Sequence, residues 1–165
     1  MQQYQHAFPG APREFIKVTE QDWRDGDIAI CHNELLAHPA WLRHLVEERG
    51  YTIETLQRFK VGYHHGLYII PIFDELGTIK NVKFYRPKSQ CKEGQKGKFG
   101  CKGKPVLVLF PLLGLNGANP LWIVEGEMDA MMAYQHDIHA ITGCSGAPSM
   151  HSAFDQNRNI LGEHR

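Results

Sequence analysis

The chain has 165 residues, of which 42% are hydrophobic and 22% charged, and its 18 lysines and arginines equal its 18 acids in number. This size and composition fit one globular domain, or two small ones that share a surface. No apolar run of about 18 residues could span a bilayer, and the N-terminus lacks the basic and apolar regions of a signal peptide. We therefore expect a soluble, intracellular protein without a membrane partner.

The cysteines are widely spaced and contain no C-x-x-C pair, so they resemble neither a disulfide framework nor a standard zinc knuckle. Reduced thiols are the simplest interpretation. Zinc favours sulfur and imidazole ligands, so a zinc site remains an alternative. Its ligands would be Cys31, His32, Cys91 and Cys101.

Residues 1–33 show no sustained period, and we expect them to be irregular, apart from a short strand at 15–18. Within this segment Asp25-Gly26-Asp27 has the composition of a turn. The segment itself suggests no function.

Helices are predicted next. Apolar residues recur at helical spacing between Glu34 and Glu48, and Pro39 interrupts them, which predicts a short helix followed by a second. Thr52 has the position of an N-cap for another short helix, and Gly62 returns the chain to an extended conformation.

A β-hairpin is predicted from strands at 67–73 and 79–85, because turn-forming residues 74–77 separate them. A basic segment overlaps its end: eight lysines and arginines but a single acid lie between Lys83 and Lys104. Glycines make residues 87–104 flexible and their charge solvated. With aromatic residues for stacking, this charge is typical of a nucleic-acid platform, and a plain solvated linker is the alternative.

The last third of the chain predicts strand, strand, helix, strand, and the last three of these form a parallel βαβ unit. The ranges are 106–110, 121–124, 127–135 and 139–142, followed by a turn at 143–148. The fold class is therefore α/β. Residues 34–104 form an α+β subdomain with the hairpin and the basic loop, and residues 105–165 form the βαβ subdomain.

Glu125 and Asp129 are the candidate catalytic residues and metal ligands. Glu125 stands at the carboxyl end of a predicted strand, where ligands bind in open α/β sheets, and Gly126 opens the following helix. Asp129 lies four residues later, so both carboxylates can face one crevice. Oxygen ligands of this kind suit Mg²⁺ or Mn²⁺. The simpler alternative is that Glu127 and Asp129 only favour the positive end of a helix.

Two segments closely resemble the TOPRIM signature of bacterial and phage primases: VEGEMDA at 124–130 and AITGCSGA at 140–147. Residues 49–63 and 70–77 look like the N-terminal part of a DnaG-type or phage helicase-primase core. The similarity covers about residues 40 to 150. It implies a TOPRIM fold, here partial, in which Glu125 is the central acid and Asp129 belongs to the same motif.

The resemblance also implies template-directed synthesis of RNA primers. Arg86 and the Lys98-Phe99 pair fall where family members carry basic and aromatic residues that hold template or nucleotide. The complete predicted platform is Lys83, Arg86, Lys88, Lys96, Lys98 and Phe99. The turns near the site contain Gly126, Gly143 and Gly146. The implied partners are single-stranded DNA, ribonucleoside triphosphates and a replicative helicase, fused or separate, in the cytoplasm of a bacterial or phage-infected cell.

One departure from the family pattern concerns the metal site. The family carries a later strand ending in an Asp-x-Asp pair that completes metal binding, and no such pair follows Glu125 here. We therefore expect these 165 residues to be weakly active or inactive alone. The alternatives to a primase are another TOPRIM enzyme that cleaves phosphodiesters, as in topoisomerases and nucleases, or a module that binds nucleic acid or helicase without catalysis.

Overall fold

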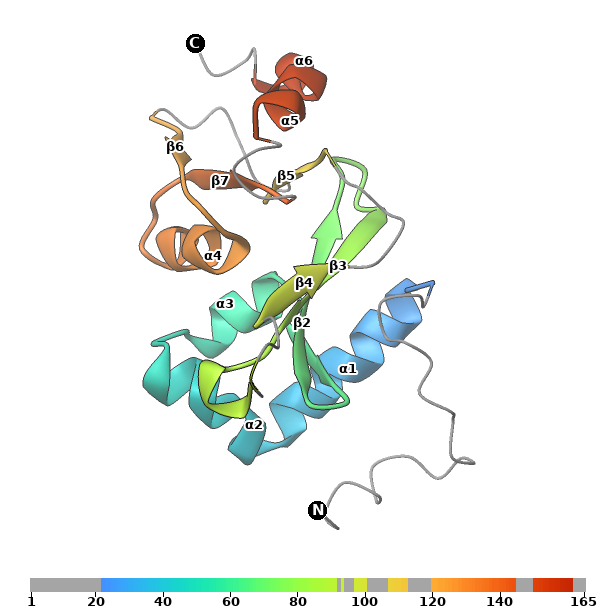
Figure 1. The fold of residues 1–165 in the computed structure, drawn as a ribbon, viewed down its shortest axis with the longest axis vertical. Helices are drawn as coiled ribbons and strands as arrows, with labels where there is room; N and C mark the ends of the chain where they lie inside the picture. Colours follow the sequence, from blue (N-terminus) through green and yellow to red (C-terminus); the bar gives the residue numbers. More distant parts are fainter. Residues whose placement is uncertain are drawn as a thin grey trace.

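The computed structural model describes residues 22–91, 93, 97–100, 107–112, 120–144 and 150–161, and the elements in these ranges form two β-sheets flanked by helices (Figure 1). The expected strand at 15–18 lies outside the described residues. No helix in the described part of the chain is long and apolar enough to cross a membrane.

The larger sheet contains four antiparallel strands in the order β1-β2-β3-β4. Its strands are β1 (Gly62–His64), β2 (Leu67–Phe73), β3 (Ile79–Tyr85) and β4 (Lys98–Gly100). The predicted hairpin is confirmed with both strand ranges as expected. Its turn is held by the Asp74 carboxylate, which accepts hydrogen bonds from the backbone N–H groups of Leu76 (3.0 Å) and Thr78 (2.8 Å). Gly77 takes a positive φ of 78° there, which favours glycine.

The two faces of this sheet pack against different helices. Alternation along β2 directs Leu67 and Ile69 into a cluster with α1 (Asp25–Ala37), and Tyr68 and Ile70 into a second cluster with the helices that follow. Those helices are α2 (Pro39–Arg43), the π-helical stretch η2 (His44–Glu48) and α3 (Ile53–Arg58). In Figure 1, α1 and α3 accordingly lie on opposite sides of β2.

Helix α1 corrects one expectation. It begins at Asp25, inside the segment expected to be irregular, so Asp25-Gly26-Asp27 is a helical first turn and not a separate turn. The Asp27 carboxylate accepts the Arg24 backbone N–H at 3.0 Å, and acids in a first turn favour the positive end of a helix. The helix packs closely on β1, because a Cβ at Gly62 would stand 2.9 Å from Cys31.

The other predicted helix boundaries are confirmed. Pro39 interrupts the helical pattern and occupies the start of α2, where its missing N–H costs nothing. Thr52 caps α3, and its hydroxyl oxygen accepts the Thr55 N–H at 3.2 Å.

The described part of the basic segment is more regular than expected. Residues 87–104 were expected to be flexible and solvated, yet they contain the short 3-10 helix η3 (Lys88–Gln90) and strand β4. Strand β4 pairs with β3, so that Lys98 stands opposite Tyr85 and Phe99 opposite Phe84. Ladder hydrogen bonding fixes this part of the backbone.

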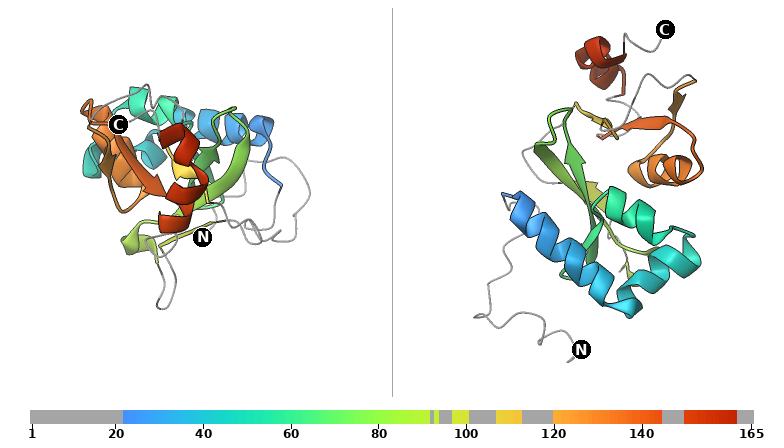
Figure 2. Two further views of the ribbon diagram at one scale, coloured as in Figure 1. Left: turned by 90° about the horizontal axis from the view of Figure 1, so that it is seen from above. Right: turned by 180° about the vertical axis from the view of Figure 1, so that it is seen from behind.

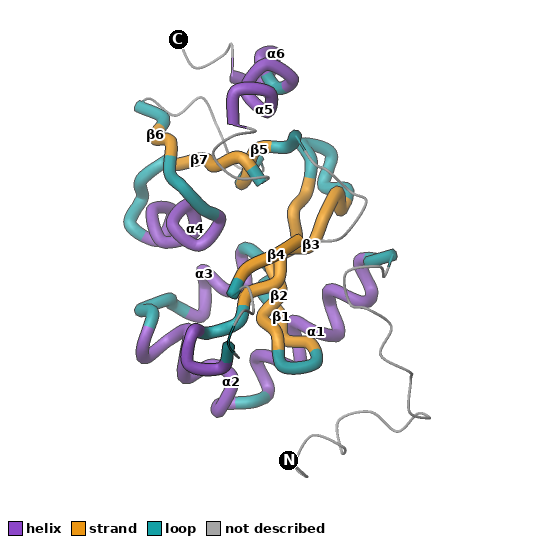
Figure 3. The backbone as a smooth tube through the Cα atoms, in the orientation of Figure 1, coloured by secondary structure: helices purple, strands orange, loops and turns teal. Residues whose placement is uncertain are grey.

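The smaller sheet has the order β5-β7-β6. Strands β6 (Trp122–Ile123) and β7 (Ala140–Gly143) are parallel, with α4 (Glu127–Gln135) between them in the chain, which confirms the predicted βαβ unit (Figure 3). Strand β5 (Leu109–Phe110) runs antiparallel to β7. Helices α5 (Met150–Gln156) and α6 (Arg158–Leu161) lie beyond this sheet, at the end of the molecule away from α1 and α2 (Figure 2).

One apolar cluster joins the two sheets. Leu56 from α3 and Phe59, which follows α3, pack in it with Phe110 from β5 and with Met128 and Met131 from α4. Helix α4 is therefore buried where it meets this cluster and β7, while Asp129 and Tyr134 on it are exposed.

Candidate functional site

The candidate site is the turn between β6 and α4. Glu125 follows the parallel strand and is exposed, Gly126 is the N-cap of α4 in an extended conformation, and Asp129 is exposed in the first helical turn. The two predicted ligands thus lie on one short segment at the carboxyl edge of the βαβ unit, and both carboxylates are open to solvent. This exposure is what a metal-phosphate site at this edge requires.

Glu127, between them, has a different environment. Its side chain is 2% exposed, and its Oε1 lies 3.6 Å from the Lys83 Nζ on β3. Lys83 was predicted to bind nucleic acid, but its side chain is 12% exposed and points at α4. The ion pair connects the hairpin to the first turn of the acidic helix.

Two residues of the loop after η2 hold that first turn from another side. The Tyr51 hydroxyl donates a buried hydrogen bond of 2.7 Å to the Met128 carbonyl oxygen, and the Arg49 Nη2 lies 3.9 Å from the Met128 Sδ. Burial is the main reason why the pKa of Tyr51 is raised to about 12, with the Arg49 charge acting against it and the Asp129 charge with it, so the phenol stays protonated as a donor. Arg49 is exposed and brings a cation beside the acidic helix.

Arg49 was not among the predicted site residues. Its position in Arg49-Gly50-Tyr51, within the stretch that resembles primases, was the available signal. Composition gave no hint, because Arg49 stands outside the basic segment.

A chain of hydrogen bonds fixes Tyr85 next to Arg49, whose guanidinium lies 5.7 Å from the ring centroid. The His44 ring bonds Tyr85 Oη through Nε2 and Glu48 Oε2 through Nδ1, both at 2.8 Å. Burial raises the pKa of Tyr85, so its hydroxyl keeps its proton. Tyr85 is thus held beside Arg49, and Lys98 is its strand partner.

The rest of the predicted platform is only partly described. Arg86 is half-buried, and its backbone N–H donates to the Gly97 carbonyl at 2.7 Å. Lys88 and the Lys98-Phe99 pair are placed by their backbone alone, in η3 and β4. Lys96 and Gly146 lie outside the described residues. Strands β3 and β4 therefore bring the backbone positions of Lys83, Arg86 and Lys98 to one end of the sheet, next to Tyr85.

Gly143 ends β7 at a close approach. A Cβ there would stand 3.0 Å from the Met150 Sδ, so the Met150 side chain would have to shift to admit a larger residue. Gly126 is buried at the start of α4 and has an extended conformation.

Glu125 and Asp129 fit Mg²⁺ or Mn²⁺ as ligands, since Mg²⁺ is commonly held by one or two carboxylates and by substrate phosphates. Within the described residues no cluster of three or more potential ligands exists, so substrate oxygens and water would complete the coordination. Of the four residues in the zinc alternative, Cys101 lies outside the described residues, and two others already have other surroundings. Burial raises the pKa of Cys31 to about 12, and His32 Nδ1 lies 2.6 Å from the Val61 carbonyl oxygen.

The sequence matches no model of a known protein family and no curated protein. Among solved structures the chain is similar to the catalytic core of the E. coli primase (TM-score 0.59, 15% identity, 74% of this chain and 54% of that chain). It is also similar to the DnaG primase catalytic domain bound to single-stranded DNA (0.61, 16%, 79% and 56%). The zinc-binding and RNA polymerase domains of the Aquifex aeolicus primase align less well (0.53, 13%, 87% and 54%).

The chain thus has the fold of a DnaG-type primase core, as its motifs predict, and it spans about half the length of the matched structures. At this level of identity the likeness concerns the fold.

Proposed function

We propose that the chain forms the metal-binding and nucleotide-binding part of a DNA primase, a nucleotidyltransferase that makes RNA primers on single-stranded DNA. One observation carries the proposal: in a primase-like fold, the exposed carboxylates of Glu125 and Asp129 stand at the carboxyl edge of a parallel βαβ unit. A purely structural role at the positive end of α4 would explain Asp129 but not Glu125, which precedes the helix.

In this proposal Glu125 and Asp129 hold Mg²⁺ or Mn²⁺, which would neutralise the triphosphate and activate the primer 3′-hydroxyl. Other residues of the chain would bind the nucleotide and the template and hold them in position. Arg49 offers a guanidinium to the phosphates, and Tyr51 fixes the helix turn that carries Asp129. Arg86 and the lysines of the basic segment bind the template backbone, with Phe99 for stacking. The whole protein would also contact a replicative helicase.

The first test uses the chain as it is. Titration with Mn²⁺, followed by electron paramagnetic resonance, should show weak binding alone and binding at least about tenfold tighter with a ribonucleoside triphosphate present, because phosphate oxygens complete the coordination. Because coupling between two ligands is reciprocal, Mn²⁺ must raise the affinity for the nucleotide by the same factor as the nucleotide raises the affinity for Mn²⁺. Binding of single-stranded DNA without any such metal effect would favour the non-catalytic module.

A second test concerns the platform. If about four cations contact phosphates, the logarithm of the affinity for oligothymidylate should fall with the logarithm of salt concentration with a slope near −3. Fluorescence anisotropy at several salt concentrations measures this slope. A flat salt response would remove the basic segment from the proposed site and leave it as a linker.

A further inference from the structure

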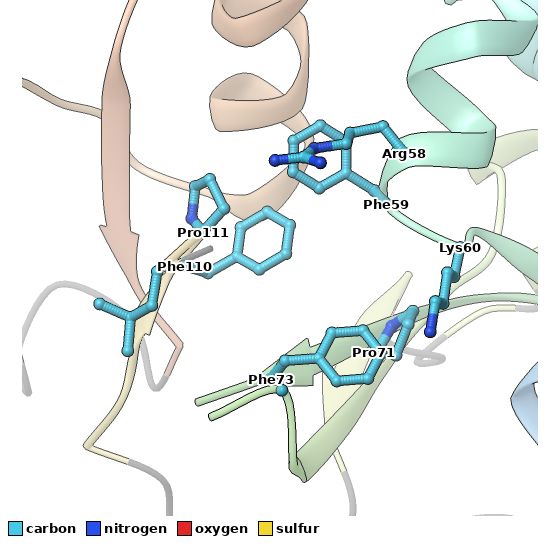
Figure 4. Close-up of a pocket in the computed structure, with 9 residues that line it drawn as sticks. Arg58, Phe59, Lys60, Pro71, Phe73, Phe110 and Pro111 are labelled. Atoms are coloured by element: carbon cyan, nitrogen blue, oxygen red, sulfur yellow. The ribbon is translucent and has the colours of Figure 1, made fainter. Parts of the chain in front are cut away.

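A pocket of about 220 Å³ lies where the end of α3, the hairpin and the segment after β5 meet (Figure 4). Its walls are apolar and its outer residues are basic. The walls include Phe59, Pro71, Phe73, Phe110, Pro111 and Leu112, and the cations are Arg58 and Lys60.

The pocket is separate from the acidic site. Strand β5 runs antiparallel to β7, so Pro111 and Leu112, which follow β5, lie toward the amino end of β7. Glu125 lies toward the carboxyl end, because the Val124 N–H bonds to the Ile141 carbonyl and the chain continues in the same direction as β7. A ligand in the pocket would therefore leave the carboxylates of the acidic site open.

Both cations are held on aromatic rings. The Lys60 Nζ lies 5.1 Å from the Phe73 ring centroid, and the Arg58 guanidinium lies 5.7 Å from that of Tyr134. Both side chains are exposed, and within the described residues no carboxylate comes within ion-pair distance of either. Two cations held beside an apolar pocket complement a ligand that carries one apolar group with a carboxylate on each side of it.

The dimensions and walls of the pocket favour a peptide over other ligands. Small-molecule sites measure about 300–1,000 Å³, so this pocket suits a single bulky side chain. Single-stranded nucleic acid needs open ring faces and a run of cations. Here Phe59 and Phe110 are 7% and 3% exposed, and the Phe73 ring is covered by Lys60. Beside the pocket, Leu76 at the hairpin tip is 82% exposed and extends the apolar surface available to a bound chain.

We propose that this pocket docks an acidic peptide segment of a partner protein, with one bulky apolar side chain in the pocket and flanking carboxylates on Arg58 and Lys60. This docking surface is independent of the proposed catalysis.

The test uses fluorescence anisotropy of the whole chain with a labelled peptide in which aspartates flank one phenylalanine. The variant R58Q/K60Q removes both charges and keeps part of each stem, and R43Q/R158Q removes two exposed charges elsewhere as a matched control. We expect R58Q/K60Q to weaken binding by at least about tenfold and the control to leave it unchanged. Alanine in place of the peptide's phenylalanine should weaken binding similarly.

Equal affinities of R58Q/K60Q and R43Q/R158Q for the peptide would overturn the proposal, as would an alanine peptide that binds as well as the phenylalanine peptide. Displacement of the peptide by oligothymidylate, with the same dependence on Arg58 and Lys60, would assign the pocket to nucleic acid instead. Neither result bears on Mn²⁺ binding at Glu125, which is measured separately.

Discussion

Glu125→Gln should lower the nucleotide-linked affinity for Mn²⁺ by at least about 100-fold, which is about 2.7 kcal/mol. The substitution keeps the shape of the side chain but removes the charge, and a unit charge pair at 4 Å contributes about 4 kcal/mol at an effective dielectric near 20. In a protein that carries a complete primase core, the same substitution should reduce primer synthesis below detection. Calorimetric titration with Mn²⁺ and nucleotide, and an assay with labelled ribonucleotides on single-stranded template, measure the two effects.

The matched control is Glu75→Gln, which neutralises an exposed acid on the hairpin turn. It should leave metal binding unchanged, and both variants should unfold within about 0.5 kcal/mol of the parent, because both side chains face solvent. Equal metal affinities for the two variants would remove Glu125 from the site and the primase proposal with it.

Lys83→Met should destabilise the protein by about 3 kcal/mol and lower its melting temperature by roughly 6–12 °C. The Lys83 and Glu127 side chains are 12% and 2% exposed, and removing the lysine deprives a buried carboxylate of this cation. Urea unfolding followed by circular dichroism measures the change. Replacing both partners, as Lys83→Met with Glu127→Leu, should recover most of the stability, because a well-packed apolar pair needs no compensation for lost hydration.

The control for this pair is Arg43→Met. Arg43 lies 3.6 Å from Glu47, the same separation, but both side chains are 68% exposed, so the loss should stay below about 1 kcal/mol. A Lys83→Met variant as mild as Arg43→Met would show that the contact with Glu127 contributes little. Oligothymidylate binding by folded Lys83→Met then tests the sequence prediction that Lys83 contacts nucleic acid.

The parts of the fold that the sequence predicted well carry strong local signals. The hairpin strands were predicted residue for residue, because turn-forming residues separate an apolar run from a second run of equal length that mixes apolar and polar residues. Thr52 and Pro39 marked helix starts through their side chains, and a glycine between a strand and a helical pattern marked the βαβ unit.

The sequence predictions were wrong or incomplete where tertiary contacts determine the secondary structure or the direction of a side chain. Helix α1 is stabilised by packing of Ile28, Cys31 and Leu35, although its first turn has the composition of a loop. Strand β4 forms because it pairs with the free edge of β3. The residues Lys98-Phe99-Gly100 alone carry no signal that predicts a strand. Within the site, Glu125 and Asp129 are exposed to solvent, as the metal hypothesis requires. The Lys83 side chain points at α4, and Arg49 lies beside Met128 of the same helix. Both features depend on how α4 packs against the first half of the chain, which local sequence does not indicate.

Helix α4 is attached to the first half of the chain at both of its ends. Tyr51 bonds the Met128 carbonyl across 77 positions of sequence, and the Gln135 side chain bonds the Thr52 N–H and the Gly50 carbonyl at 2.7 and 2.8 Å. During synthesis on the ribosome, the part of the apolar cluster around Leu56 and Phe59 that α4 packs against therefore remains uncovered until the segment through Gln135 has emerged. A chain cut between the two sheets would lose the packing of α4 on this cluster, so the larger sheet is expected to be less stable alone than in the whole chain.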